Sequence, residues 1–251
     1  MANYNSFVFA GHGVSEITEV YDPGAVKGNI KENDIARSIQ SAAKKYLTTT
    51  NLVIHYDENN FTDEDLAGNN YSKKAGIVIH INAGGGKGSE IYVPSMEKFL
   101  GSDFILVDGI SKLLNIPNRG VKSRDYNTGE ISIRENGKAL NYIDYYKEIR
   151  DAWARGISLA ILEVGFIDTS DLSKIKSNID GIGLLVAKYI AEICGVTIKI
   201  PTTNTGTIIA ANNTYYRVVC GSFKEKQNAQ HRIDDFKRVG FDAFIELYKK
   251  E

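Results

Sequence analysis

The sequence is poor in cysteine and has no long run of apolar residues. Its two cysteines, Cys194 and Cys220, lie in different segments and do not form a metal-binding pair; a reduced compartment or two buried thiols would account for them. No apolar run reaches the length that spans a bilayer. The net charge is only −1, which favours neither nucleic acid nor an anionic membrane as a partner. We therefore expect no nucleic-acid partner and no membrane insertion.

The N-terminus also lacks the features of a secretory signal peptide. Residues 1–6 carry no basic segment, and the apolar run Phe7–Ala10 is short and has no small-residue cleavage site. We expect synthesis in the cytoplasm without a signal peptide. The length of 251 residues suits one large domain plus a small appendage.

Short apolar runs, bounded by glycine or polar residues, alternate with segments of helical periodicity. Such runs indicate buried strands of a parallel sheet. Strands are predicted at 6–10, 51–56, 77–83, 89–93 and 157–166. Helices are predicted at 30–47, 62–74, 94–114 with a possible break at Gly101, 140–155 and 179–194, and residues 115–138 are rich in loop-forming residues. The alternation predicts an α/β fold.

Two histidines lie at the ends of predicted strands, and acidic residues open the helix between them. His80 lies in the run 77–83 just before three glycines, and His12 lies between two glycines after the first strand. Together with Glu32 they supply two imidazoles and a carboxylate, the ligand set of a catalytic zinc with an open fourth position. The alternatives are a hydrogen-bonded core histidine, a turn that happens to contain His12, and Glu32 and Asp34 placed to complement the helix dipole.

Glu163 lies near the end of the apolar strand predicted at 157–166. Because an unpaired buried carboxylate is costly, this side chain is expected to be neutral, paired or associated with a metal. Beside a zinc site, a carboxyl group can take a proton from water and pass it to a leaving nitrogen. We therefore predict a catalytic role for Glu163.

Five short segments together resemble the zinc-dependent N-acetylmuramoyl-L-alanine amidases (type 3) of bacteria and their phages. The segments, which occur in the family's order, are Gly11-His12-Gly13, Glu32-Asn33-Asp34, His80-Ile81-Asn82-Ala83, Asn118-Arg119-Gly120-Val121-Lys122 and Leu162-Glu163-Val164-Gly165-Phe166. The resemblance covers residues 5–195. It implies a twisted, mostly parallel sheet with helices on both faces, of the phosphorylase/hydrolase-like type.

The resemblance also implies hydrolysis of the amide bond between the lactyl group of N-acetylmuramic acid and the L-alanine of the peptide stem in peptidoglycan. It implies one Zn²⁺ held by His12, Glu32 and His80, with Glu163 as the catalytic residue. Two features differ from the family: Phe-Ala precedes Gly-His in place of Asp-Pro, and segment 139–155 is longer and more aromatic, which affects groove shape and stem-peptide preference.

Other functions stay open alongside the amidase. One is a zinc peptidase or deacetylase acting on the cell wall, and another is a non-catalytic wall-binding protein. For the amidase, the lack of a signal peptide implies action on the wall after release, as an endolysin or an autolysin.

The C-terminal part is predicted to form a separate module. Residues 199–213, rich in Thr and Asn, are predicted to link a catalytic domain at 1–198 to a βαβ module at 214–251, with strands at 215–223 and 241–248 and a helix at 227–239. This module resembles one half of a sporulation-related repeat (SPOR), which binds the glycan strands of peptidoglycan. Because that family normally has two repeats, we hypothesise that two chains pair their modules in a homodimer. The alternative is that the module packs on the catalytic domain.

Overall fold

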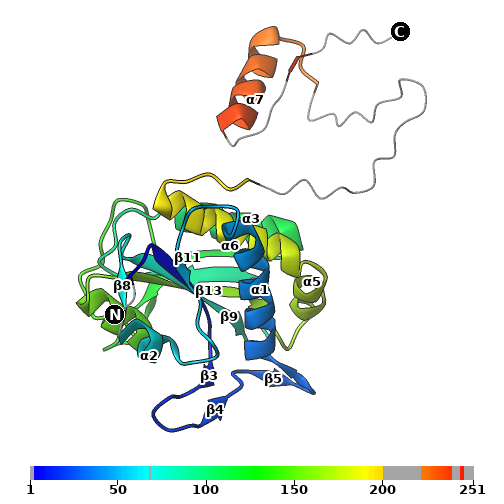
Figure 1. The fold of residues 1–251 in the computed structure, drawn as a ribbon. Coiled ribbons are helices and arrows are strands. Elements are labelled where there is room, and N and C mark those ends of the chain that lie inside the picture. The colour runs from blue at the N-terminus through cyan, green and yellow to red at the C-terminus, as the bar shows by residue number, and fades with distance from the viewer. Residues whose placement is uncertain (1–2, 68, 200–221, 239–243, 246–251) are drawn as a thin grey trace. The chain divides into compact units, whose positions relative to one another are not determined.

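The computed structural model describes residues 3–67, 69–199, 222–238, 244 and 245 (Figure 1). The chain divides into two compact units, Met1–Pro201 and Thr202–Glu251. In the second unit the described element is α7 (Lys226–Arg238), which confirms the predicted helix. Most residues of the strands predicted on either side of it, and nearly all of the predicted linker, lie outside the described residues. Within the described ranges, no helix is both long and apolar enough to cross a membrane.

Within residues 3–199, a seven-stranded sheet forms the centre of the first unit. From one edge to the other its strands are β12 (Ile131–Ile133), β11 (Asn118–Arg124), β10 (Ser89–Tyr92), β13 (Ser158–Phe166), β9 (Ala75–Asn82), β2 (Ser6–Ala10) and β7 (Ile54–His55). The strands β13, β9, β2 and β7 run parallel, and so do β10 and β11. β10 is antiparallel to β13, and β12 is antiparallel to β11. The predicted mostly parallel α/β sheet is confirmed.

The sheet is buried on both faces, and β2 shows why its strands are apolar at every position. Val8 and Ala10 pack in one hydrophobic cluster, whereas Phe7 and Phe9 pack in another. Successive strand residues point to opposite faces, so a strand covered on both sides needs apolar residues throughout. All four of these side chains are fully buried.

Helices cover both faces of this sheet. One face carries α1 (Glu32–Leu47), α3 (Gly101–Leu114), α5 (Asp171–Ser177) and α6 (Ile179–Cys194). The other carries α2 (Thr62–Ala67) and α4 (Lys147–Ala154). The helices α1 and α6 approach closely at Gly183, where an added Cβ would lie 2.4 Å from that of Ala42. Glycine is therefore required at this crossing.

Three short two-stranded ladders complete the described strands of the first unit. They are β1 (Asn3–Tyr4) with β8 (Asn70–Tyr71), β3 (Gly13–Val14) with β4 (Tyr21–Asp22), and β5 (Val26–Lys27) with β6 (Ile30–Lys31). The last two ladders fold residues 13–31 into an excursion from the end of β2. This excursion returns the chain to the same edge of the sheet, where α1 begins.

Two of the predicted helices begin later than expected, because long-range hydrogen bonds hold their first residues in other conformations. The helix predicted at 94–114 begins only at Gly101. Before it, the backbone N–H of Ser95 donates to Oδ1 of Asp144 at 2.9 Å. The helix predicted at 140–155 begins at Lys147, since Tyr145 donates its N–H to the carbonyl of Arg124.

Two further predictions were wrong in extent. The helix predicted at 62–74 ends at Ala67, and the chain then forms β8. Residues 115–138, predicted as loop, contain β11 and β12. β11 carries too many polar residues for an apolar pattern to show it, and β12 is only 3 residues long.

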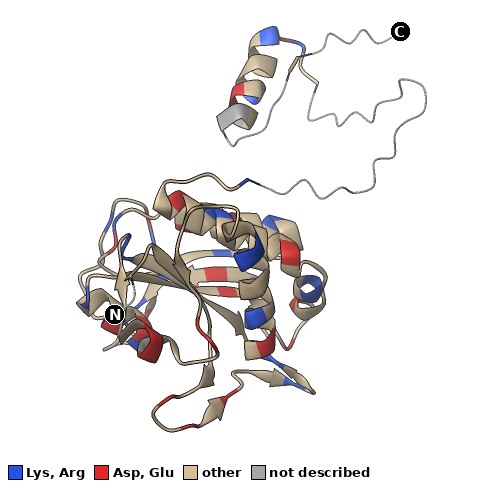
Figure 2. Ribbon diagram, in the orientation of Figure 1, with Lys and Arg blue, Asp and Glu red and all other residues tan. Residues whose placement is uncertain are grey.

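Charged positions are interspersed over the helices, and acidic positions also occur within the central strands (Figure 2). Glu163 on β13 and Glu90 on β10 are cross-strand partners. The Glu90 side chain is buried, and so is Oε2 of Glu163. Because a buried carboxylate destabilises the fold unless it is paired or neutral, this region of the sheet is a candidate functional region.

Candidate metal centre and active site

The candidate residues meet at one edge of the sheet. The strands β2, β9 and β13 are adjacent and parallel, so their carboxyl-terminal ends lie together. His12 follows β2, and His80 lies near the end of β9 directly opposite Glu163 on β13. Ligands of open α/β sheets commonly bind at such an edge.

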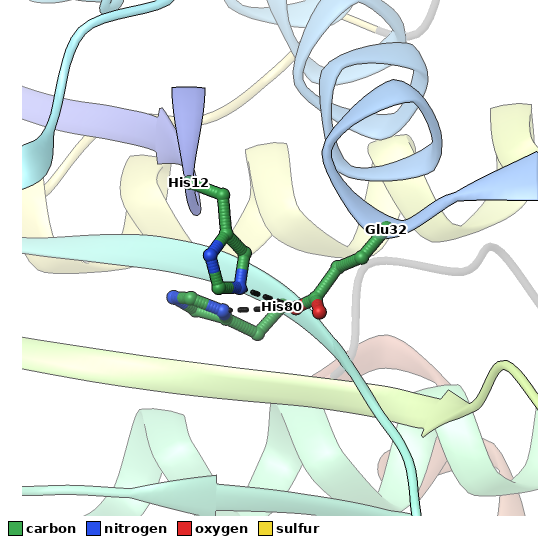
Figure 3. A group of neighbouring side chains, drawn as sticks. All are labelled: His12, Glu32 and His80. Atoms are coloured by element: carbon green, nitrogen blue, oxygen red, sulfur yellow. Dashed lines mark hydrogen bonds and ion pairs between the residues drawn. The ribbon is translucent and has the colours of Figure 1, made fainter. Parts of the chain in front are cut away.

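Glu32, the first residue of α1, is the hub of the cluster (Figure 3). Its Oε1 lies 3.2 Å from Nε2 of His12 and 3.0 Å from Nδ1 of His80. Backbone N–H groups of Ile81 and Ala25 donate to its two oxygens at 2.9 and 2.8 Å. Burial alone would raise the pKa of Glu32, but the hydrogen bonds from both imidazoles outweigh it and hold the pKa well below its usual range. The carboxyl group is therefore ionised.

Of the two acidic residues that open α1, only Glu32 faces the histidines. Glu32 is buried, whereas Asp34 is exposed to solvent. The helix-dipole interpretation did not distinguish Glu32 from Asp34. Because residues two apart on a helix point in different directions, Asp34 faces solvent when Glu32 faces the histidines.

The backbone around His12 is held in an uncommon conformation. The φ angle of His12 is +66°, in the left-handed region that non-glycine residues seldom adopt. The preceding Gly11 is fixed on both sides: its N–H donates to the carbonyl of Ile79 at 2.8 Å, and its carbonyl accepts from the Asn33 side chain at 2.9 Å. These bonds turn the His12 ring toward α1.

Asp22 sets the orientation of the His12 ring. Its Oδ2 lies 2.8 Å from Nδ1 of His12, and its Oδ1 accepts the backbone N–H of Gly24 at 2.9 Å. A carboxylate acceptor favours a proton on Nδ1, so Nε2, which hydrogen-bonds to Glu32, is the ring nitrogen that can lose its proton to bind a cation. Burial alone would lower the pKa of His12, but the hydrogen bond and charge of Glu32 raise it.

His80 is enclosed by carboxylates. Its Nδ1 faces Glu32, while its buried Nε2 has no hydrogen-bond partner among the described residues and lies 3.9 Å from Oε2 of Glu148. Burial alone would lower the pKa of His80, but Glu32, Glu148 and Glu163 together raise it to about 9. The cluster is thus an electron-rich environment that attracts a cation.

Glu163 lies beside this cluster in a cavity of about 490 Å³. Burial raises the pKa of its carboxyl group to about 7. Its Oε2 is buried and has no hydrogen-bond partner among the described residues. The residues that line the cavity are His12, Ala25, Glu32, His80, Ile81, Asn82, Ala83, Tyr146, Lys147, Glu148, Ile161 and Glu163.

The cluster is a possible metal site. One ligand atom from each of His12, Glu32 and His80 lies within 4.8 Å of the other two. Two imidazoles and a carboxylate are a donor set that binds zinc at catalytic sites and leaves one position open to the cavity. The ring orientation imposed by Asp22 fits this use, because Nδ1 is held by Asp22 while Nε2 faces the other donors and would bind the metal after losing its proton.

Two residues beside the histidines, Asp22 and Glu148, are not predicted from the sequence. Asp22 belongs to an Asp-Pro-Gly segment typical of a turn, and Glu148 lies in an ordinary amphipathic helix pattern. Neither pattern carries a signal of its role, because the contact of Asp22 with His12 depends on the fold of the loop between them, and Glu148 contacts His80 from a distant part of the chain.

Comparison with known proteins identifies the family. A family model described as N-acetylmuramoyl-L-alanine amidase matches residues 7–191. The chain belongs to the N-acetylmuramoyl-L-alanine amidase family. The matched range contains all four candidate residues. The chain is therefore a peptidoglycan amidase, a hydrolase of the cell wall.

A curated relative extends the likeness over nearly the whole amidase chain. The sporulation-specific N-acetylmuramoyl-L-alanine amidase of Bacillus subtilis (strain 168) is 24% identical over 252 residues. The alignment covers 96% of this chain and 84% of the relative, so it reaches into the second unit as well.

Solved structures share the fold of the first unit. Cwp6 from Clostridium difficile has a TM-score of 0.53 at 21% identity, over 76% of this chain and 29% of Cwp6, so the amidase spans under a third of that protein. A Neisseria meningitidis protein assigned as an N-acetylmuramoyl-L-alanine amidase has a TM-score of 0.52 at 19% identity, over 77% of this chain and 98% of that protein.

Proposed function

We propose that the chain is a zinc-dependent amidase that cleaves the bond between the lactyl group of N-acetylmuramic acid and the L-alanine of the peptide stem. His12, Glu32 and His80 hold the zinc, and Glu163 handles the proton. The supporting observation is the convergence of three donor atoms within 4.8 Å of one another in the cavity that Glu163 also lines.

Zinc, when bound, supplies a Lewis acid that polarises the scissile carbonyl and makes water nucleophilic near neutral pH. The chain's own residues prepare for this chemistry. Asp22 keeps the His12 ring oriented through its 2.8 Å contact with Nδ1. The backbone N–H groups of Ile81 and Ala25 fix the Glu32 carboxylate.

Glu163 is assigned the proton transfer. With a pKa of about 7, its carboxyl group changes protonation state close to neutral pH, as a general base that later becomes a general acid requires. The oxygen of water bonds to the lactyl carbonyl carbon, and the C–N bond breaks. Glu163 takes one proton from that water and delivers it to the leaving nitrogen. The products are a lactyl carboxylic acid and a stem peptide with a free L-alanine amine.

Metal analysis of the purified chain, followed by mass analysis of products from purified peptidoglycan, tests this proposal. Bound zinc and free stem peptides that begin with L-alanine are expected. Peptides cut at another bond, or released acetate, would instead indicate a peptidase or a deacetylase. A chain without metal that leaves wall turbidity unchanged would be a non-catalytic wall-binding protein.

Two substitutions separate the assigned roles. Glu163→Ala is expected to retain zinc and lose hydrolysis, whereas His80→Ala is expected to lose zinc as well. If Glu163→Ala loses zinc along with activity, Glu163 is a zinc ligand and its assignment as the base is wrong.

The second unit is proposed to bind glycan strands of the wall, and to do so as a pair of modules from two chains. The alignment with the Bacillus subtilis relative, which covers 96% of this chain, supports a wall-related role for residues 199–251. Sedimentation equilibrium of the full chain is expected to show a dimer. A monomer that binds purified walls would contradict the pairing.

The enzyme is further proposed to reach its substrate after release from the cell that makes it. The Bacillus subtilis relative is a sporulation-specific amidase, which favours an autolysin over an endolysin.

A further inference from the structure

A buried group of charges lies next to the site, on the strands beyond Glu163. Glu90, whose side chain is 1% exposed, is the cross-strand partner of Glu163. Its Oε1 accepts a hydrogen bond at 3.0 Å from Asn82, which lines the site cavity. Its Oε2 is paired with both Lys122 and Arg119. The single carboxylate of Glu90 is thus paired with two cationic side chains beside the site cavity.

Arg119 is the member of this group that reaches solvent. Its Nε donates to Glu90 at 2.7 Å, and its guanidinium carbon lies 5.2 Å from the centre of the Phe166 ring. Its Nη1 makes a 3.5 Å contact with the carbonyl of Lys87, and its Nη2 has no partner among the described residues. The side chain is 36% exposed, so a fixed fork of N–H donors faces outward.

Neutralising Glu90 does not require Arg119. Lys122, whose side chain is only 9% exposed, already supplies one positive charge to the same oxygen. The positive charge of the Arg119 guanidinium is therefore not needed to balance Glu90. Glu90 holds one edge of this group, and the Phe166 ring lies against one of its faces. A planar, pre-organised guanidinium with free donors is suited to binding a carboxylate.

The distance between Arg119 and Glu163 limits which carboxylate of the substrate Arg119 can reach. Arg119 lies on β11, two strands from Glu163 on β13, and adjacent strands are about 4.8 Å apart, so the strand axes are about 10 Å apart. An extended peptide advances about 3.3–3.6 Å per residue, so two or three residues span that gap. On the sugar side no carboxylate is available, since the lactyl carboxyl group is itself part of the scissile amide.

We propose that Arg119 binds a carboxylate of the stem peptide, within two or three residues after the L-alanine, and selects for substrates that carry it. This rests on the proposed function, and it assigns the peptide end of the substrate to the side of the site cavity on which β10 and β11 lie. Glu90 is the positioning residue that holds the Arg119 fork.

A pair of synthetic substrates tests the assignment. Both are N-acetylmuramoyl peptides with L-alanine and two further residues, and they differ only in whether the carboxyl groups of those two residues are free or amidated. The wild-type chain is expected to favour the free acid by about 10- to 100-fold in kcat/KM, mainly through KM. Arg119→Met is expected to abolish that preference, and Arg119→Lys to keep part of it.

Arg155→Met is the matched control, because Arg155 is exposed and precedes β13 at the opposite end of the strand from Glu163. It is expected to leave the preference unchanged. Equal cleavage of both substrates by the wild-type chain, or an equal loss on both substrates in Arg119→Met, would overturn the assignment while the amidase function stands. Failure of the wild-type chain to cleave either substrate would overturn the proposed function and this assignment together.

Discussion

Replacing Glu163 with glutamine is expected to stabilise the metal-free protein at alkaline pH while removing its activity. Burial raises the pKa of Glu163 from 4.5 to about 7. The folded state thus holds this proton more tightly than the unfolded state, so ionisation destabilises the fold as pH rises through that interval. A pKa difference of this size corresponds to about 3 kcal/mol in the free energy of unfolding.

Chemical denaturation with a chelator present, at pH 5 and pH 8, measures this effect. Glutamine does not ionise, and any penalty for burying its amide is the same at both pH values, so the comparison isolates ionisation of the carboxyl group. Between the two pH values, the stability of Glu163→Gln relative to wild type is expected to rise by about 2–3 kcal/mol. Glu192→Gln, at an exposed position on α6, is the control and should show no such rise.

Parallel pH dependence in Glu163→Gln and wild type would refute the reasoning. It would show that the folded protein does not shift the ionisation of Glu163, and the physical basis for its proton transfer would be lost. In the zinc-loaded enzyme, the same variant is expected to lower kcat by about 10²- to 10⁴-fold with zinc retained.

Three other outcomes follow from the structure. Asp22→Ala is expected to weaken zinc binding about 10- to 100-fold in competition with a chromophoric chelator, and unchanged affinity would contradict its orienting role. Gly24→Ala is expected to lower zinc affinity, because its added Cβ would lie 2.5 Å from the His12 ring and 2.6 Å from Oε2 of Glu32. Gly28→Ala is the control for backbone strain, because Gly28 has a similar φ of +61° but open space around it; this variant should bind zinc normally. Burial raises the pKa of Asp103 to about 7, so the free energy of unfolding of wild type should fall as pH rises toward 7. In denaturation curves, Asp103→Asn should make this fall with pH smaller. An unchanged dependence of the unfolding free energy on pH would contradict the raised pKa of Asp103.

The parts of the fold predicted correctly are those whose signals are local. The strand β9 and the helix α6 follow from continuous apolar runs and from helical periodicity that ends at Gly195, whose φ is +69°. The same runs place His80 and Glu163 at one edge of the sheet, because parallel strands bring their ends together.

The parts that failed depend on partners distant in sequence. The strand β11 reads as a loop because Arg119 and Lys122 are charged, and only Glu90, 29 and 32 residues away, makes their position within a sheet stable. Ser95 leaves the predicted helix for a hydrogen bond with Asp144, 49 residues away. Periodicity within a window of one element contains no information on such pairs.

The bonds that hold the His12 loop have a consequence for handling the enzyme. Gly11 is fixed by the carbonyl of Ile79 and the side chain of Asn33, and neither contact involves an ion. Stripping the protein with a chelator should therefore leave it folded, with its near-ultraviolet circular dichroism intact. Adding the ion back should then restore turnover at once, without a refolding delay.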